Sequence, residues 1–184
     1  MAGIFIEKAS DNSACELIRT ASLEAATQLA FHERRSQLRL LDYLLGVHVD
    51  QESTSFLSHA VKIMGFAFTK WREESLIIKI KQVTEIQDSP AEAAFEYAMV
   101  FLVTGIESVI LEDCICNFEN ARSWFEKASS MTELFPQADI YAISLSILCE
   151  LYKKENAENF PSLIEEMKSS IFEYQEWHHR ETRL

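Results

Sequence analysis

The stretch SPAEAAFEYAMVFLVTG, residues 89–105, decides the fold of this chain. Its first four residues, Ser89 to Glu92, have the pattern of a helix start, with an N-cap serine, a proline at the first helical position and a capping-box glutamate. Farther along, residues 100–115 place apolar side chains on nearly every face of a helix, which is typical of a helix or helix pair buried in the centre of a fold. We therefore predict a helix over residues 90–105 with the core of the protein around it.

The composition of the whole chain favours helices joined by short links. Of its 184 residues, 48% are hydrophobic, whereas only four are Gly and three are Pro. So few turn-forming residues argue against a β sandwich or barrel. The length suits one good hydrophobic core and is short for two domains. We predict an all-α fold, either an antiparallel helical bundle or a short helix-hairpin array, in a single domain over 1–184. An N-terminal bundle over 1–88 and an acidic half over 89–184 form the alternative division.

The period of the apolar residues predicts where the helices lie. The expected ranges are 13–30, 32–46, 53–70, 73–87, 90–105, 106–114, 117–132, 138–155 and 161–177. The first two ranges are also compatible with one long helix. Gly46 is expected to end the second helix, because a stripe of leucines stops there and glycine tolerates the left-handed cap.

Neither a secretory signal nor a membrane span is expected. The first seven residues contain an apolar patch, but they lack the basic start and the long apolar run of a signal peptide. No apolar run approaches the roughly twenty residues that a membrane-spanning helix needs. We therefore expect a cytoplasmic protein that does not bind membranes.

The charge of the chain is negative and uneven. Residues 1–88 carry ten basic and twelve acidic side chains, net −2, whereas residues 89–184 carry seven basic and seventeen acidic side chains, net −10. This charge repels phosphate backbones and anionic lipid surfaces, so nucleic-acid and membrane binding are disfavoured. A strongly acidic helical protein is instead suited to another protein as its partner, in particular a basic one.

Small and aromatic residues recur in the second half at the spacing of a helix pair. The spacing within the first helix of a tetratricopeptide repeat is matched by Tyr97, Ala98, Phe101 and Gly105. The spacing within the second helix is matched by Ala121, Phe125 and Ala128. A further match to the first helix of such a repeat starts at Leu145 and includes Leu148, Cys149 and Tyr152. Residues 90–155 therefore resemble a partial and degenerate tetratricopeptide repeat, in which small residues let two antiparallel helices approach closely. Between Gly105 and Ala121 the chain is about eleven residues longer than the repeat allows.

The resemblance implies a non-catalytic protein–protein interaction module. Such an adaptor, chaperone-like or inhibitor protein would hold a peptide or helix of its partner in a helical groove. The predicted partner-binding residues are Tyr97, Asn120, Trp124 and Tyr141, whereas Phe101 is expected in the core. Two other classes stay open: a small regulatory or accessory subunit that acts as a homo-oligomer, and an enzyme with a helical pocket. For the enzyme, the first residues to examine are His32, His48 and His59.

No motif in the chain requires a particular chemistry. It has no Gly-rich phosphate loop, nucleophile elbow or dinucleotide fingerprint. Cys114 and Cys116 would point about 200 degrees apart on a helix, which is unsuitable for a shared metal ion. We predict no catalytic residue, no metal site and no cofactor. The last three residues, Thr182 to Leu184, resemble the carboxyl-terminal ligands of PDZ domains.

Overall fold

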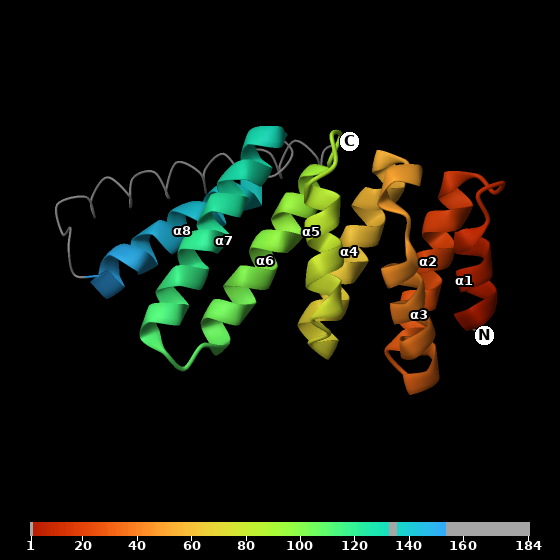
Figure 1. Cartoon of the computed structure of the whole chain (residues 1–184), viewed down its shortest axis with the longest axis horizontal. Coiled ribbons are helices and arrows are strands. Elements are labelled where there is room, and N and C mark those ends of the chain that lie inside the picture. Colours follow the sequence, from red (N-terminus) through yellow and green to blue (C-terminus); the bar gives the residue numbers. More distant parts are fainter. Residues whose placement is uncertain (1, 133–135, 154–184) are drawn as a thin grey trace, which may run out of the picture. The chain divides into compact units, whose positions relative to one another are not determined.

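A computed structural model describes residues 2–132 and 136–153 of the chain (Figure 1). This described part contains α-helices and one short 3-10 turn, and no strand. The prediction of an all-α fold is therefore confirmed. The helices are α1 (Ala2–Ser10), α2 (Glu16–Ala30), α3 (Arg34–Gly46), α4 (Thr54–Trp71), α5 (Ser75–Thr84), α6 (Ala91–Glu107), α7 (Leu111–Met131) and α8 (Pro136–Lys153), and the 3-10 turn η1 spans Val49–Gln51.

The chain divides into two compact units, Met1–Glu96 and Tyr97–Leu184, and the division falls inside α6. In the first unit, α2 packs against α1, α3 and α4. Helix α5 packs against α4 and α3 and completes this group of packed helices (Figure 1). The alternative division into two domains after residue 88 stays a prediction.

The core of the first unit holds the segment that joins α3 to α4. Its largest fully buried side chains are Leu23, Leu40, Leu44, Phe56, Leu57, Met64, Leu76 and Ile80, with Val61 and Val83 beside them. Val47 and Val49 of the joining segment belong to one buried cluster with Val83 of α5 and Ala93 of α6. The buried side chains of these two valines fix the position of the joining segment at the surface of the unit.

The two ends of α4 and the end of α3 show how local chemistry sets the boundaries of the helices. Helix α4 begins where the Ser53 hydroxyl accepts a hydrogen bond from the backbone N–H of Phe56 at 3.1 Å, and it ends at Arg72 in the left-handed conformation, with φ 53°. Helix α3 ends at Gly46 as predicted, but the reason given for it is wrong. No glycine in the described residues has a positive φ, and Val47 leaves the helix in an extended conformation with φ −58° and ψ 125°.

In the second unit, α7 and α8 pack against each other. The predicted small and aromatic positions of α7 are fully buried, and so is Leu145 of α8: Ala121, Phe125 and Ala128 are each 0% exposed. Gly105 lies against Phe118. A Cβ atom placed on Gly105 would come 2.7 Å from the Phe118 ring, which leaves no room for a larger residue. The burial expected for small residues at helix contacts is therefore confirmed.

One of the predicted helix ranges is wrong, and one helix has no predicted range. Residues 106–114 do not form a helix of their own, because α6 runs to Glu107, a turn follows, and α7 begins at Leu111. Apolar residues on every face and the absence of Gly or Pro hide this turn in the sequence. Helix α1 was not predicted at all. The expected helix over 161–177 and the last three residues lie outside the described residues.

No helix among residues 2–132 and 136–153 is both long enough and apolar enough to cross a membrane.

Candidate functional site

The four predicted partner-binding residues lie in the second unit and differ in exposure. Tyr97 is only 9% exposed and Trp124 is half-buried, whereas Asn120 and Tyr141 are exposed. The rings of Tyr97 and Trp124 meet edge to face, with their centroids 4.9 Å apart. Tyr141 instead stacks on Phe125, with the centroids 5.0 Å apart. The described contacts therefore join Tyr97 to Trp124, and they place Tyr141 in a different ring pair.

Further side chains extend the contact between Tyr97 and Trp124. Phe101, which was expected in the core, is half-buried, and its ring centroid lies 5.0 Å from that of Tyr97. The Lys127 ammonium lies 4.4 Å from the centroid of the Trp124 ring, a cation–π contact. Asn120 lies one turn before Trp124 on α7. This part of α6 and α7 combines aromatic rings with polar groups at their edge.

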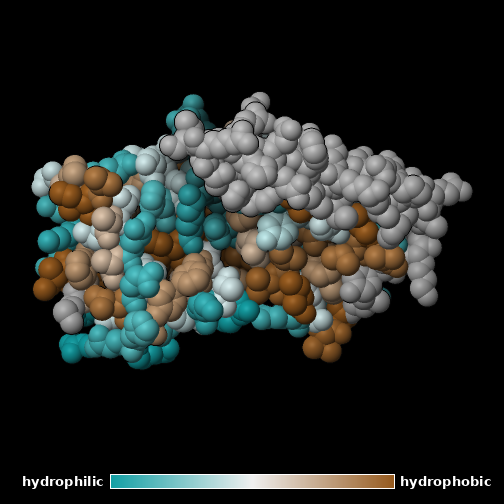
Figure 2. All heavy atoms as spheres, turned by 180° about the vertical axis from the view of Figure 1, so that it is seen from behind, coloured by the Kyte–Doolittle hydropathy of each residue, from teal (hydrophilic) through white to brown (hydrophobic). Residues whose placement is uncertain are grey.

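The end of α6 and the turn that leads to α7 expose three large aliphatic side chains, which we call the apolar tip. Val109 is 99% exposed, Ile106 67% and Ile110 59%. Figure 2 shows hydrophobic atoms protruding at its lower edge, where this turn lies. The sequence interpretation missed the apolar tip because it assigned these residues to a buried helix. The signal that could have found it is the excess length between Gly105 and Ala121, compared with the repeat.

Negative charge surrounds the apolar tip. Glu107, Glu112 and Asp113 flank it and are exposed. No Lys or Arg occurs anywhere between Tyr97 and Ala121. Glu112 and Asp113 lie in the first turn of α7, where a negative charge also favours the helix dipole. The surface is therefore an apolar centre in an acidic setting.

A hollow of about 450 Å³ lies in the first unit, between residues 47–51 and α5. We call it the polar hollow. Its volume is within the range of about 300 to 1,000 Å³ that is usual for small-molecule sites. The buried Val47 and Val49 contribute apolar surface. The remaining lining residues are His48, Asp50, Gln51, Lys79, Gln82, Glu85 and Ile86.

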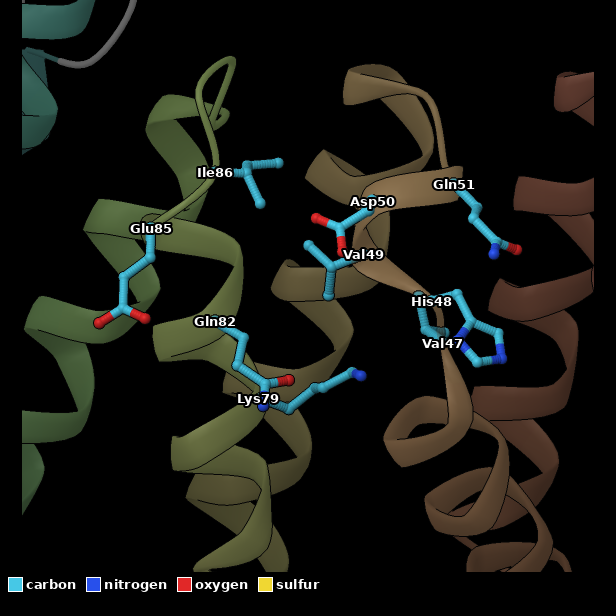
Figure 3. A pocket seen from close by; sticks show the side chains of 9 residues that line it. All are labelled: Val47, His48, Val49, Asp50, Gln51, Lys79, Gln82, Glu85 and Ile86. Carbon is cyan, nitrogen blue, oxygen red and sulfur yellow. The ribbon is translucent and has the colours of Figure 1, made fainter.

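The side chains of the polar hollow point in different directions (Figure 3). Asp50 points from the joining segment toward the α5 side, and Lys79 extends from α5 toward the joining segment. His48 points away from both, and Glu85 turns outward from the hollow. The Glu85 carboxylate lies 3.8 Å from the ammonium of Lys81, one turn earlier on α5. The charges that face each other across the hollow are therefore those of Asp50 and Lys79.

Lys79 is half-buried, and among the described residues its ammonium has no ion-pair partner. Burial lowers the pKa of Lys79, whereas the negative charge of Asp50 acts in the opposite direction. The two groups thus interact across the hollow without direct contact. The polar hollow contains a partly desolvated cation that the fold leaves without a salt bridge.

A second, smaller hollow of about 230 Å³ adjoins the polar hollow and shares Val47, His48 and Gln51 with it. Two of the polar side chains that line it are engaged in the fold. Glu52 pairs with Arg19, and the Tyr43 hydroxyl donates to the backbone carbonyl of Ala9 at 3.2 Å. Burial raises the pKa of Tyr43, so the phenol keeps its proton over the physiological range.

The histidines do not converge. His32 and His48 are exposed, and His59 lies 3.7 Å from Glu24 on the surface of the first unit. In the part of the chain that the structure describes, no hydrogen bond joins two of the titratable side chains that line the polar hollow. The paired nucleophile and base that covalent catalysis uses are thus absent from these lining residues.

A carboxylate is buried near the end of the first unit. Glu96 lies so close to Gly65 of α4 that a Cβ placed on Gly65 would overlap its carboxylate. Burial raises the pKa of Glu96 to about 8, against the opposing effect of the Lys62 ammonium and with a further increase from Glu92. The Glu92 carboxylate lies 3.3 Å from the Lys62 ammonium. Lys62 therefore pairs with Glu92, and with a pKa of about 8 Glu96 is largely protonated at neutral pH.

No protein family, curated protein or solved structure was found to match this chain. The resemblance to tetratricopeptide repeats stays a prediction.

Proposed function

We propose that this protein is a non-catalytic interaction module whose apolar tip binds a basic amphipathic segment of a partner protein. The observation that supports this proposal is the exposure of Val109, Ile106 and Ile110, which are 99%, 67% and 59% exposed. Clustered aliphatic side chains at the surface are typical of binding sites, because water contact with them is unfavourable. Each one that a partner covers fully would contribute about 1.5–3 kcal/mol.

The charge around the apolar tip indicates a basic partner. Glu107, Glu112 and Asp113 provide negative charge on both sides of the tip, and residues 89–184 carry a net charge of −10. A partner helix with an apolar stripe and Lys or Arg beside it would match both features. Opposite charge would speed the encounter and make the binding weaker at high salt.

The predicted residues of α7 extend the proposed surface. Asn120 is exposed and Trp124 is half-buried in its contact with Tyr97. Trp and Tyr are enriched among the residues that contribute most to binding energy. We include Asn120 and Trp124 in the partner-binding surface, with Tyr97 as the buried support of the Trp124 ring. Tyr141 stays a predicted contact on α8.

Features of the described residues favour this function over the two alternatives. The titratable groups of the polar hollow do not form a catalytic pair, which favours binding over catalysis. Two apolar tips of a homo-oligomer would bring like charges together at Glu112 and Asp113, which opposes self-association. A partner with positive charge has no such penalty.

A pull-down with matched variants tests the proposal. The tagged full chain is compared with Val109→Ser/Ile110→Ser, which removes apolar surface, and with Glu112→Gln/Asp113→Asn, which removes charge. The control is Leu17→Ser/Ile18→Ser on α2, because those side chains are 78% and 49% exposed in the other unit. Circular dichroism establishes that each variant keeps its helices.

We expect one specific partner to be recovered at low salt by the parent and by the control. The tip variant should lose it, and the charge variant should bind it more weakly. A synthetic peptide covering the partner's basic amphipathic segment should then bind the parent in a fluorescence-anisotropy titration. A partner that the tip variant still binds fully would contradict the proposal. A dimer seen by light scattering and abolished by Val109→Ser/Ile110→Ser would favour the homo-oligomer instead.

A further inference from the structure

We propose that the polar hollow binds a small zwitterion, a free amino acid or dipeptide that carries one ammonium and one carboxylate group. The site lies between residues 47–51 and α5 in the first unit. It shares no residue with the apolar tip, so the two proposals stand or fall separately.

The inference starts from two opposite charges on opposite walls. Asp50 extends from the joining segment and Lys79 from α5, each toward the other side of the hollow (Figure 3). They influence each other electrostatically, yet they do not form an ion pair. A ligand with a carboxylate near Lys79 and an ammonium near Asp50 would satisfy both charges at once.

The free protein leaves Lys79 in an unfavourable state. Its ammonium is half-buried, and burial lowers its pKa because water solvates the charge less well there. The Lys79 ammonium forms no ion pair that offsets this desolvation, although the charge of Asp50 acts in its favour, and a ligand carboxylate beside it would offset the desolvation more fully. Glu85, the other acid of the lining, turns outward and pairs with Lys81. It does not compete for Lys79.

Other ligand classes fit less well. A simple anion at Lys79 would be repelled by Asp50, and a simple cation at Asp50 would be repelled by Lys79. The described residues contain no cluster of three or more His, Cys, Asp or Glu side chains suited to a metal ion. A polyanion such as a nucleotide would meet one cation only. A molecule with balanced and separated charges is the complementary class.

The uncharged part of the lining suits the body of such a ligand. Gln82 follows Lys79 by three residues on α5, so it lies on the same face of the helix. Its side-chain amide can both donate and accept hydrogen bonds, as a peptide group or a carboxylate requires. Val49 and Ile86 provide apolar surface for methylene groups.

The test uses the full chain and a series of zwitterions with increasing charge separation: glycine, β-alanine, γ-aminobutyrate and glycylglycine. Acetate and methylammonium serve as probes with a single charge. Binding is measured by calorimetry, and its location by the backbone amide shifts of residues 47–51 and 79–86. We expect one length of the series to bind at least about tenfold more tightly than either single-charge probe, since a second charge-assisted hydrogen bond contributes that much.

Matched variants assign the two charges. Lys79→Met and Asp50→Asn should each weaken binding of the best zwitterion by about tenfold or more. Lys70→Met on α4 and Asp42→Asn on α3, both exposed and outside the hollow, should leave it unchanged. Lys79→Met should also melt no lower than the parent, because it removes a partly desolvated cation that forms no ion pair. Loss of binding in this variant therefore cannot be attributed to unfolding.

Three results would overturn the proposal. One is the absence of binding by every member of the series. Another is binding of acetate or methylammonium as tightly as the best zwitterion. The third is a zwitterion that binds Lys79→Met or Asp50→Asn as tightly as it binds the parent.

Discussion

The guanidinium of Arg19 and the carboxylate of Glu52 form a buried ion pair, with Nη2 and Oε1 2.8 Å apart and side-chain exposures of 10% and 11%. The same guanidinium donates from Nε to the carbonyl of Ala9 at 2.9 Å, and it lies 4.1 Å from the ring centroid of Phe56. One side chain of α2 therefore connects the end of α1, the segment before α4, and α4 itself. Such a residue should matter for stability more than any exposed arginine.

Replacing Arg19 by Met should reduce the free energy of unfolding by about 3–5 kcal/mol, because Glu52 is left as an unpaired buried charge. Urea denaturation followed by circular dichroism measures the change. Adding Glu52→Gln to Arg19→Met should restore part of the loss, since the stranded charge is removed. Arg35→Met, on the exposed surface of α3, is the control and should be nearly neutral. An equal effect of Arg35→Met would show that the pair has no special role.

Glu96 should make stability depend on pH. Its pKa is about 8 in the folded protein and 4.5 by the ordinary value for Glu, so the folded state binds more protons between these two pH values. The stability contributed by its protonated form is complete below pH 4.5, decreases as the pH rises, and is lost above about pH 8. The slope is at most about 1.4 kcal/mol per pH unit.

The variant Glu96→Gln should remove this slope, because the amide keeps the shape of the protonated acid and does not ionise. Urea denaturation at a series of pH values compares it with the parent. The variant should be the more stable protein at pH 8, and the difference should shrink toward pH 5. Two parallel curves would show that Glu96 ionises normally in the folded state.

Ala121 and Ala128 should tolerate no large side chain. Both are 0% exposed on α7, so Ala121→Trp or Ala128→Trp should reduce the free energy of unfolding by about 1–3 kcal/mol or more through overpacking. Ser123→Trp, at an exposed position of the same helix, is the matched control. Thermal melting distinguishes them. If both alanine variants melt with the control, these positions do not lie at a helix contact.

Two glycines should respond in opposite ways to replacement by alanine. A Cβ on Gly105 would come 2.7 Å from the Phe118 ring, whereas a Cβ on Gly46 would meet nothing within 4 Å. Gly105→Ala should therefore destabilise the protein. Gly46→Ala should stabilise it by as much as about 1 kcal/mol, because alanine is the better helix former and Gly46 has an ordinary φ. A neutral or stabilising effect of Gly105→Ala would contradict the close packing at Gly105, and a destabilising effect of Gly46→Ala would contradict the open space at Gly46.

The sequence predicted the positions whose cause is local. The helix predicted over 53–70 from its apolar period corresponds to α4, and the burial of Ala121 and Ala128 follows from the spacing of small residues on one helix. The boundary predicted between residues 105 and 106 lies two residues before the turn that follows Glu107, but the exposure of this turn was missed, because apolar residues on both sides of it continue the pattern of a buried helix. Val109 indicates a binding surface because it is exposed, not because it is a valine. Its exposure depends on how the rest of the chain packs around it, which the sequence pattern does not show.

The polar hollow could not be predicted from the sequence. Asp50 and Lys79 lie far apart along the chain, and neither belongs to a recognisable motif. They come together because Val47, Val49 and Val83 pack in one core cluster, which fixes the joining segment beside α5. The predicted residues Tyr97 and Trp124, by contrast, are within reach of a single helix hairpin, and their contact is a short-range result.

Helix α6 belongs to both compact units of the chain. Ala93, near its start, is part of the core of the first unit, and Tyr97, one turn later, belongs to the second. Recombination at the change in charge after residue 88 would deprive the first unit of Ala93 and of the partner of Lys62. The two units therefore cannot be exchanged between proteins by a cut after residue 88. A gene fusion that transfers either unit must include the whole of α6, and it then also includes a few residues of the other unit.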